Sequence, residues 1–525
     1  MRTDEKKLTI LDSTLRDGTQ GEGISLSEDD KIKIIHALDE IGIDFIEAGN
    51  PASNPKDSEL FRKLKNEKLK HSMICAFGST RRKGVKTADD WAIKALEAAD
   101  TPAVSIVGKA SKKQVTDIIR TTPEENLDMV RETIGYFKAI GRFVIFDAEH
   151  FFDAYREDAD YAKSVIEAAS KADIICLCDT NGGSYTEDIY STVTEMRESF
   201  PECSFGVHCH NDCGLAIASS MRAVDAGAVH VQGTYLGFGE RCGNTNLSTL
   251  IANLSLKRNI DCIEDLRLLT PTARRIADVA NYTLPGSRPY VGRSAFAHKG
   301  GMHIDAVNKE SSSFEHVSPE TVGNHRRFLI SEMSGKSTLM RMINMVDPTI
   351  THESPEVAEI IDELKLKEME GYQFEGAEGS FELIIRRKLG KMQKFFELDY
   401  FKTIGEQPLP ANAYPASAVM KVRVGRETEI TAAEGNGPVN ALDLALRKAL
   451  MRFYPRLSEM HLTDFKVRVL ESDATTAATV RVLIESSDRR RKWSTIGVSN
   501  DVIEASFIAL KDSVEYKLML DTMGR

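Results

Sequence analysis

SFGVHCHND, residues 204–212, is an apolar run that ends in two histidines separated by one residue. In an extended strand, side chains two residues apart point to the same side, so His208 and His210 can direct both imidazoles at one point. Two imidazoles supply half of a divalent-metal site, and the end of a strand is where parallel α/β folds place their chemistry. Taken alone, the pair is equally compatible with two histidines exposed to water.

Seven further apolar runs of strand length lie within the first 240 residues, and helical patterns separate them. The segment 27–41, for example, opens with a serine N-cap and three acidic residues and then shows helical apolar spacing. Eight such units in about 250 residues match a (β/α)8 barrel, although a doubly wound open sheet gives the same alternation. The expected strands are 8–12, 43–48, 71–77, 103–107, 142–147, 173–179, 204–210 and 228–234.

Polar residues at the ends of these strands decide between the two folds. They follow or end the first, fifth, sixth and seventh strands: Arg16, Asp17, Glu149, Thr180, His208 and His210. The ends of so many strands meet only in a closed barrel, whereas an open sheet concentrates its site at one switch point. The sequence therefore predicts an α/β fold with a catalytic TIM barrel over residues 1–275.

The chain changes character after the barrel. From 276 to 407 the alternation stops, and helical segments at 355–370 and 377–394 predict a linker with small helical subdomains. The run PLPANAYP, 408–415, marks the next boundary. Beyond it, residues 408–525 predict an α+β domain with strands at 418–424, 428–433, 464–470, 477–485 and 492–498. A small domain of this kind, appended to an enzyme barrel, more often regulates or dimerises than catalyses.

The composition excludes several classes of partner. The 525 residues carry a formal net charge of −11, which disfavours nucleic acid and anionic membranes. No apolar run approaches membrane-spanning length, and the N-terminus has neither a signal-peptide nor a transit-peptide pattern. The eight cysteines form no C-x-x-C pair. We therefore expect reduced cysteines and a cytoplasmic protein.

A carboxylate at the predicted barrel mouth extends the histidine pair. Asp17, in LDSTLRDGTQ (11–20), would complete a two-His-one-carboxylate metal site with open positions. Such positions suit a bidentate 2-oxo acid whose ketone the metal polarises. Arg16 beside it can supply fixed donors to an oxyanion. Capping of the strand end is the alternative for both acidic residues of this run, and we prefer it for Asp12.

Three runs occur in the order of a known set of signatures: LRDGTQ (15–20), HCHNDCG (208–214) and GFGERCGN (237–244). Together they resemble the signatures of the 2-isopropylmalate, homocitrate and citramalate synthase family. The resemblance continues through GGMH (300–303) and reaches the tail, where GNGP (435–438) and IESSD (484–488) are similar to the family's dimeric regulatory domain. Within the family, FGSTRRK (77–83) and the compact barrel most resemble the citramalate synthase branch.

This resemblance implies a Claisen-type condensation of acetyl-CoA, as co-substrate, with a 2-oxo acid. It implies that Asp17, His208 and His210 bind a divalent metal ion, either Mn2+, Mg2+ or Zn2+, with Asn244 as a further ligand or as a residue that contacts a ligand. Arg16 matches the residue that stabilises the substrate carbonyl oxygen as it becomes an alkoxide.

The resemblance also implies roles for residues away from the metal. Thr180 matches a position that contacts the oxo-acid carboxylate. The acetyl methyl group must lose a proton, so a base is required, and Glu149 matches an active-site acid that is our leading candidate. His303 and Asp305 match linker residues that reach a catalytic site, in the family that of the partner subunit. The alternatives are that Glu149 only orients a ligand and that His303 only contacts CoA.

One departure bears on proton transfer. Family members often carry a tyrosine in the segment aligned with 313–316, where this chain has Phe314. If that hydroxyl helps to move a proton elsewhere, another group such as His303 must do so here.

The activity implied by the resemblance is the condensation of acetyl-CoA with pyruvate and water to citramalate and CoA, in isoleucine biosynthesis. It implies a homodimer whose tail binds isoleucine as a feedback inhibitor. The first alternative is a larger acceptor, either 2-oxoisovalerate, as in 2-isopropylmalate synthase of leucine biosynthesis, or 2-oxoglutarate. One methylene group in the acceptor pocket changes the preference between two acceptors by only about 1–3 kcal/mol, and the motifs do not identify the acceptor. A lyase of the hydroxymethylglutaryl-CoA type is disfavoured by the long linker and tail, and a non-catalytic regulator by the full set of expected ligands.

Overall fold

The computed structural model describes residues 8–53, 55–299, 301–328, 336–405, 415–470, 478–488 and 491–523. The chain forms two compact units, Met1–Phe296 with His316–Arg326, and Ala297–Glu315 with Arg327–Arg525. Of the helices in the described ranges, none is long and apolar enough to span a bilayer.

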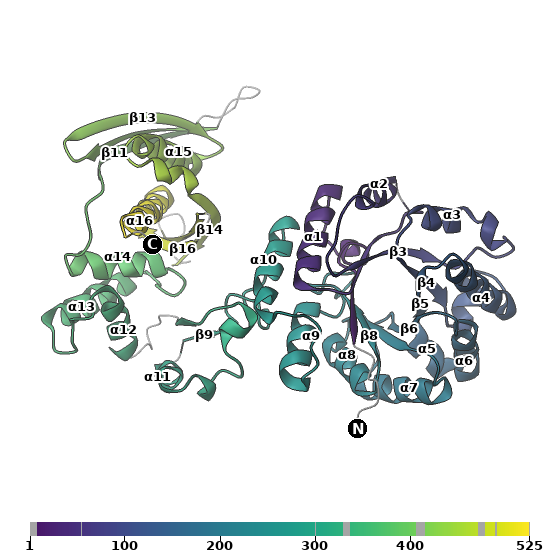
Figure 1. Ribbon diagram of the computed structural model, residues 1–525. Coiled ribbons are helices and arrows are strands. Elements are labelled where there is room, and N and C mark those ends of the chain that lie inside the picture. Colours follow the sequence, from purple (N-terminus) through teal and green to yellow (C-terminus); the bar gives the residue numbers. More distant parts are fainter. Residues whose placement is uncertain are drawn as a thin grey trace. The chain divides into compact units, whose positions relative to one another are not determined.

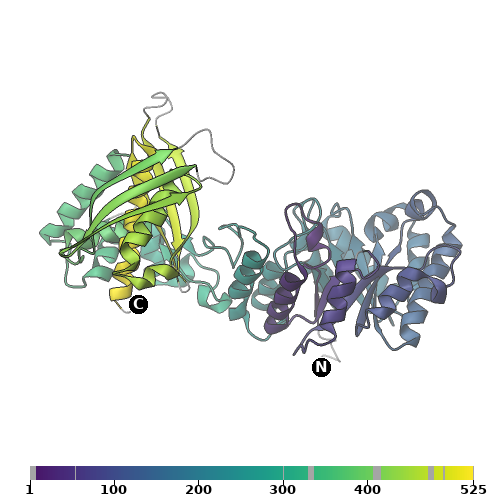
Figure 2. The same cartoon turned by 90° about the horizontal axis from the view of Figure 1, so that it is seen from above.

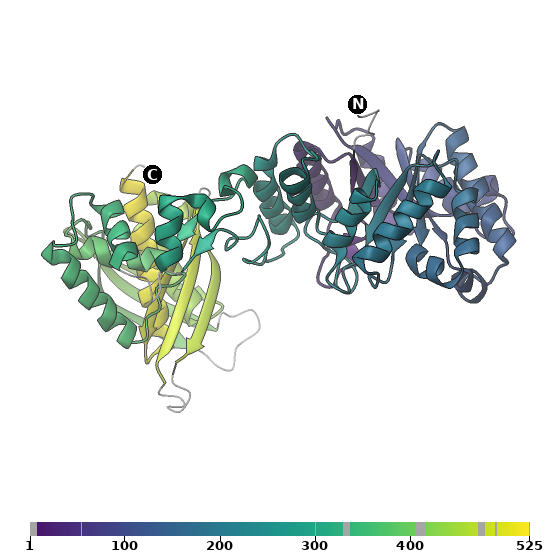
Figure 3. The same cartoon turned by 90° about the horizontal axis from the view of Figure 1, so that it is seen from below.

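The first unit confirms the predicted barrel. Eight parallel strands pair in chain order and close when β8 pairs with β1, with helices on the outside (Figures 1 and 3). The strands are β1 (Thr9–Asp12), β2 (Phe45–Gly49), β3 (Met73–Ser79), β4 (Ala103–Lys109), β5 (Phe143–Glu149), β6 (Ile174–Asp179), β7 (Phe205–Cys209) and β8 (His230–Gly233). The helices are α1 (Glu28–Ile41), α2 (Pro55–Leu64), α3 (Trp91–Ala98), α4 (Pro123–Ala139), α5 (Phe151–Glu157), α6 (Ala159–Ala168), α7 (Thr186–Ser199), α8 (Ala216–Asp225), α9 (Leu247–Asn253) and α10 (Leu269–Val279).

Several strand ends differ from the predicted ones by one or two residues, and two of these differences involve predicted site residues. β5 runs two residues further than expected, so Glu149 is its last residue, paired in register with Lys109 of β4. β7 ends at Cys209, and His210 instead forms an isolated bridge with Asn244. Both differences arise from neighbouring chain segments, which a pattern within one strand does not contain.

The inside of the barrel changes from apolar to polar along the strands. An apolar cluster includes the first residues of β2, β4 and β6, which are Phe45, Ala103 and Ile174. Because inward positions recur every second residue, the next inward positions on β2 and β4 are Glu47 and Ser105. Both are fully buried. A layer of polar side chains therefore lies between the apolar filling and the carboxyl ends of the strands.

The second unit contains two three-stranded antiparallel sheets, each with a helix packed on it. This agrees with the α+β domain predicted for the C-terminal part of the chain. α15 packs on one three-stranded sheet and α16 on the other (Figure 2). The elements are β9 (Ala297–His298), α11 (Gly301–Lys309), β10 (Arg327–Phe328), α12 (Lys336–Val346), α13 (Pro355–Met369), α14 (Glu378–Lys388), β11 (Glu397–Gly405), β12 (Ala416–Val424), β13 (Glu427–Gly435), α15 (Pro438–Met451), β14 (His461–Val469), β15 (Val480–Ser487), β16 (Lys492–Ser499) and α16 (Val502–Thr522).

The prediction was wrong about the segment that follows α14. The helix expected at 377–394 ends at Lys388, because Gly390 adopts a φ of +63° that terminates it. Residues 397–405 then form β11, a strand that the linker prediction did not contain. The predicted boundary run at 408–415 lies outside the described residues, apart from Pro415.

Candidate active site

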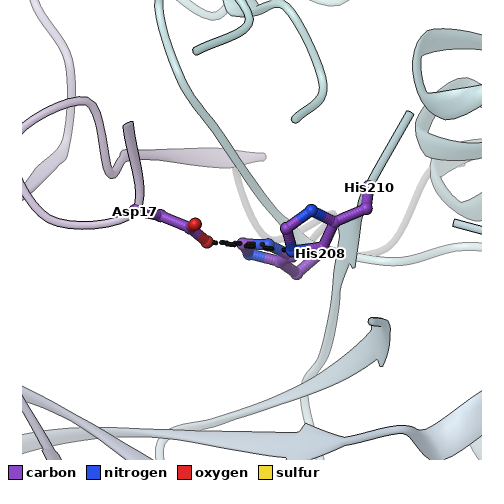
Figure 4. Close-up of side chains that lie close together, drawn as sticks. All are labelled: Asp17, His208 and His210. Carbon is purple, nitrogen blue, oxygen red and sulfur yellow. Dashed lines mark ion pairs between the residues drawn. The ribbon is translucent and has the colours of Figure 1, made fainter. Parts of the chain in front are cut away.

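Asp17, His208 and His210 meet at the mouth of the barrel. His208 lies on β7 and His210 directly after it, while Asp17 lies in the turn after β1. The Asp17 Oδ2 atom is 3.4 Å from His208 Nε2 and 3.9 Å from His210 Nε2 (Figure 4). One ligand atom from each residue lies within 4.8 Å of the other two, and all three side chains are buried. This is the arrangement that the strand periodicity predicted.

The charges of these groups suit a metal ligand set. Burial alone would raise the pKa of Asp17, but the charge of Arg16 and the hydrogen bond from His208 hold it well below its usual range. Burial and the neighbouring His208 lower the pKa of His210 to about 4, so its imidazole is neutral. Burial would lower the pKa of His208, yet Asp17 raises it. Bound metal takes the place of ligand protons, so a carboxylate and a neutral imidazole are already in the required state.

Asn244 lies beside this group, where the loop after β8 returns to the barrel. Its Nδ2 donates to the Phe238 carbonyl at 3.0 Å, while its buried Oδ1 has no hydrogen-bond partner within the described ranges. The Nδ1 of His210, the residue with which it forms a bridge, is likewise buried without one. Buried polar atoms are rarely left unpaired, so this side of the group has acceptor capacity for a cation.

Arg16 is held from several sides. Its Nε donates to Glu47 Oε2 at 2.7 Å, and the same oxygen accepts a hydrogen bond from Ser13 at 2.5 Å. The guanidinium lies 3.9 Å from the ring centre of Phe77 and 3.4 Å from Asp17. Because the Nε side and one face are occupied, the guanidinium presents its terminal nitrogens in a fixed direction.

The buried groups around Arg16 carry more negative than positive charge. The single guanidinium of Arg16 interacts with the carboxylates of Asp17, Glu47 and Asp147. Burial and the charge of Glu47 raise the pKa of Asp147 to about 6, and burial raises that of Asp12 to about 7. Groups whose ionised form is so disfavoured gain from a nearby divalent cation. The residues present therefore fit a divalent metal ion.

A second group of potential metal ligands lies deeper, formed by Asp147, Cys176 and Cys178. Both oxygens of Asp147 already accept hydrogen bonds, from Ser105 at 2.5 Å and from Gln232 at 2.7 Å. Burial raises the pKa of the Cys176 thiol well above its usual value. A metal here would have to displace protons and hydrogen bonds together, so the first group is the better candidate.

Two further predicted residues lie at neighbouring strand ends. Glu149 forms an ion pair with Lys109, the last residue of β4, so its carboxylate is engaged rather than free. Thr180 follows β6, and its hydroxyl oxygen accepts the backbone N–H of His150 at 2.8 Å. With its oxygen engaged, that hydroxyl can turn its own proton towards an acceptor.

His303 and Asp305 belong to the second unit and are not part of the barrel group. Both are exposed on α11, where Asp305 pairs with Lys309 at 2.6 Å. The His303 ring stacks on Phe314, with ring centres 4.0 Å apart. Phe314, the residue that departs from the family pattern, is therefore in contact with His303.

Sequence reasoning missed several polar residues of the barrel interior. Glu47, Asp147 and Gln232 are buried inside β2, β5 and β8. A usable signal was present, because a charged or amide side chain inside an apolar strand needs a partner. The partners lie on other strands or just after β1, however, and only the closed barrel brings them together.

Comparisons with known proteins match this architecture along the chain. The HMGL-like family matches residues 7–276, the homocitrate synthase post-HMGL domain-like family 290–370, and the LeuA allosteric (dimerisation) domain 375–518.

Relatives that match nearly the whole chain distinguish the citramalate synthase branch from the 2-isopropylmalate synthase branch. An (R)-citramalate synthase of Aquifex aeolicus is 48% identical over 520 residues, which cover 98% of each chain. One of Geobacter sulfurreducens is 47% identical and covers 97% of each. A probable 2-isopropylmalate synthase of Methanosarcina mazei is 30% identical over 97% of this chain and 95% of that protein. The chain belongs to the (R)-citramalate synthase family.

Proposed function

We propose that this enzyme condenses acetyl-CoA with pyruvate and water to give citramalate and CoA. The observation that carries the proposal is the 48% identity over almost the full chain to an (R)-citramalate synthase, against 30% to a probable 2-isopropylmalate synthase. The groups at the barrel mouth support the chemistry, since they offer a cation site beside a fixed guanidinium.

In this proposal Asp17, His208 and His210 hold a divalent metal ion, and Asn244 contributes its unpaired Oδ1. When bound, the ion supplies Lewis-acid polarisation of the pyruvate ketone. Arg16 donates to the ketone oxygen and stabilises the alkoxide that forms there. The hold of Glu47 on the Arg16 Nε supports this role, because the donors need no rearrangement as charge develops.

The remaining residues act on the pyruvate carboxylate and on the methyl group of acetyl-CoA. Thr180 donates a hydrogen bond from its hydroxyl group to the pyruvate carboxylate. Glu149 removes a proton from the acetyl methyl group. For this, the ion pair between Glu149 and Lys109 opens as substrate enters. His303, with Asp305 beside it on α11, is the second candidate base, and its stacking on Phe314 supports a fixed ring orientation.

We also propose a homodimer whose C-terminal domain binds isoleucine as a feedback inhibitor. The match of residues 375–518 to the LeuA allosteric (dimerisation) domain supports both parts. The predicted domain boundaries, after residue 275 and after residue 407, are part of the same proposal. None of the eight cysteines forms a disulfide in the described part of the chain, which supports the reducing cytoplasm as the compartment.

The acceptor is tested by mixing the purified protein with acetyl-CoA, Mn2+ or Mg2+, and each 2-oxo acid in turn, while free thiol is measured. We expect release with pyruvate and at least tenfold less with 2-oxoisovalerate or 2-oxoglutarate. Release with 2-oxoisovalerate but not with pyruvate would replace the proposal by a 2-isopropylmalate synthase. Addition of isoleucine or leucine to the same assay tests the regulatory domain, and no inhibition by either would leave it as a dimerisation module.

The metal group is tested by His210→Ala, with His71→Ala as the matched control on the exposed surface of the barrel. We expect His210→Ala to abolish thiol release with every acceptor and to weaken Mn2+ binding, while His71→Ala changes neither. Retained activity in His210→Ala would refute the metal assignment.

A further inference from the structure

A chain of hydrogen bonds runs from His208 across the inside of the barrel. His208 Nδ1 is 2.9 Å from the side-chain oxygen of Gln232 on β8. The Gln232 amide nitrogen donates to Asp147 on β5 at 2.7 Å, and the Ser105 hydroxyl on β4 donates to the other Asp147 oxygen at 2.5 Å. All four side chains are buried. The chain thus joins a proposed metal ligand to three strands that carry none of the other predicted ligands.

The direction of each hydrogen bond follows from the chemistry at its far end. The Asp147 carboxylate only accepts, so it requires the Gln232 amide to turn its NH2 group inwards. The Gln232 oxygen then faces His208 and also only accepts, so His208 Nδ1 must carry the proton. Nε2, which is 3.4 Å from Asp17, is left as the nitrogen that can bind a metal ion.

We propose that Gln232 is a positioning residue that holds His208 as the Nδ1–H tautomer with Nε2 directed at Asp17, and that Asp147 and Ser105 fix the orientation of Gln232. This inference rests on the proposed metal site. Partners of this kind set both the ring orientation and the ligand basicity of a metal-binding histidine, and their loss typically weakens metal binding about 10–100-fold. Gln232 contacts His208 at Nδ1 and not at the Nε2 that faces Asp17, and its amide nitrogen contacts Asp147.

A purely structural role makes a different prediction. If Gln232 only fills the barrel interior, its replacement lowers stability and leaves the metal affinity of the folded protein unchanged. The two roles are therefore separated by measuring Mn2+ binding to the full chain without substrates, together with thermal unfolding of the metal-free protein.

The test uses two replacements of similar size. Gln232→Met removes the acceptor for His208, and we expect the Mn2+ Kd to rise about 10–100-fold. Gln232→Glu keeps an oxygen towards His208 and, with a proton on its other oxygen, a donor towards Asp147. We therefore expect its Kd to remain much closer to that of the parent. Cys75→Ala is the matched control, since Cys75 is a buried barrel side chain outside this chain of hydrogen bonds, and its Kd should be unchanged.

Two results would overturn the inference: an unchanged Kd in folded Gln232→Met, or equal losses in Gln232→Met and Gln232→Glu. If Gln232→Met does not fold, Ser105→Ala takes its place, because it frees Asp147 and lets the Gln232 amide turn. A rise of about threefold or more is then expected, and an unchanged Kd overturns the inference. Failure of the metal site itself is recognised separately, since His210→Ala would then bind Mn2+ as the parent does.

Discussion

At the scale of single residues, His230 combines full burial with a titratable ring. It opens β8 at 0% exposure, with Nδ1 2.8 Å from the Thr9 hydroxyl. Its Nε2 has no hydrogen-bond partner in the described part of the chain. Burial, followed by the charge of His208, lowers its pKa to about 3. The folded barrel thus keeps this imidazole neutral at pH values where an unfolded histidine is protonated.

This burial predicts how stability depends on pH. Because the unfolded chain binds the proton near pH 6.5 and the folded chain only near pH 3, the stabilisation is complete above about pH 6.5 and is lost as the pH falls towards 3. Each pH unit costs about 1.4 kcal/mol, so about 2 kcal/mol is lost by pH 5. Urea unfolding of the metal-free protein at pH 7.5 and 5 measures it.

The matched variants are His230→Asn and His71→Asn, the latter on the exposed surface. We expect His230→Asn to be less stable at pH 7.5 but to lose about 2 kcal/mol less than the parent between the two pH values. His71→Asn should follow the parent. Equal losses in all three proteins would show that His230 is not protonated on unfolding in this range.

The same scale shows how far the site could be predicted from sequence. The periodicity of an extended strand brought His208 and His210 to one side, and the barrel closure brought Asp17 to them, as the structure has them. Gln232 and Glu47 could not be assigned in this way. Each lies inside a barrel strand, and its partner lies on another strand or in the turn after β1, at a position fixed by the register of the closed sheet.

At the scale of elements, strands and helices were predictable where burial is one-sided or complete. All eight barrel strands overlap their predicted ranges, because strands buried on both faces give continuous apolar runs. β11 was not predictable, since its nine residues are half-buried or exposed and leave no clear apolar pattern. It is held by pairing with β12 along its length, which is information from elsewhere in the chain.

The packing of α16 on β16 gives a prediction at this scale. A Cβ atom on Gly497 would lie 2.0 Å from the Ala505 carbonyl oxygen and 2.9 Å from the Ala509 nitrogen, both backbone atoms of α16. Backbone cannot move aside as a flexible side chain can, so Gly497→Ala must push the helix away from the strand. We expect the second unit to lose about 1–3 kcal/mol or more of stability.

Gly405→Ala is the matched control, because a Cβ at Gly405 meets no atom of the described residues within 4 Å. Differential scanning calorimetry should show a lower midpoint for one unfolding transition in Gly497→Ala. In Gly405→Ala the midpoints should equal those of the parent. Thiol release should survive in both at temperatures below that transition. An unchanged midpoint in Gly497→Ala would mean that α16 lies further from β16 than described.

At the scale of the whole molecule, the second unit has an apolar strip that the described residues of this unit leave exposed. Phe465, Val467 and Val469 alternate along the edge strand β14 and are 37%, 47% and 54% exposed. Phe465 and Val467 pair in register with Ile484 and Val482 of β15, which are fully buried. The strip therefore continues the apolar face of the sheet beyond its covered part. Exposed apolar edge strands promote association unless they are covered.

We expect a second copy of the chain to cover this strip in the proposed homodimer, in line with the match to a dimerisation domain. Val467→Lys places a charge in the strip, and burying it without a partner is costly, so the dimer should dissociate at least tenfold more readily. Lys466→Glu is the control, because neighbouring residues of a strand point to opposite faces. Sedimentation velocity over a dilution series measures the effect. A Val467→Lys protein that stays as dimeric as the parent would show that the copies meet on another surface.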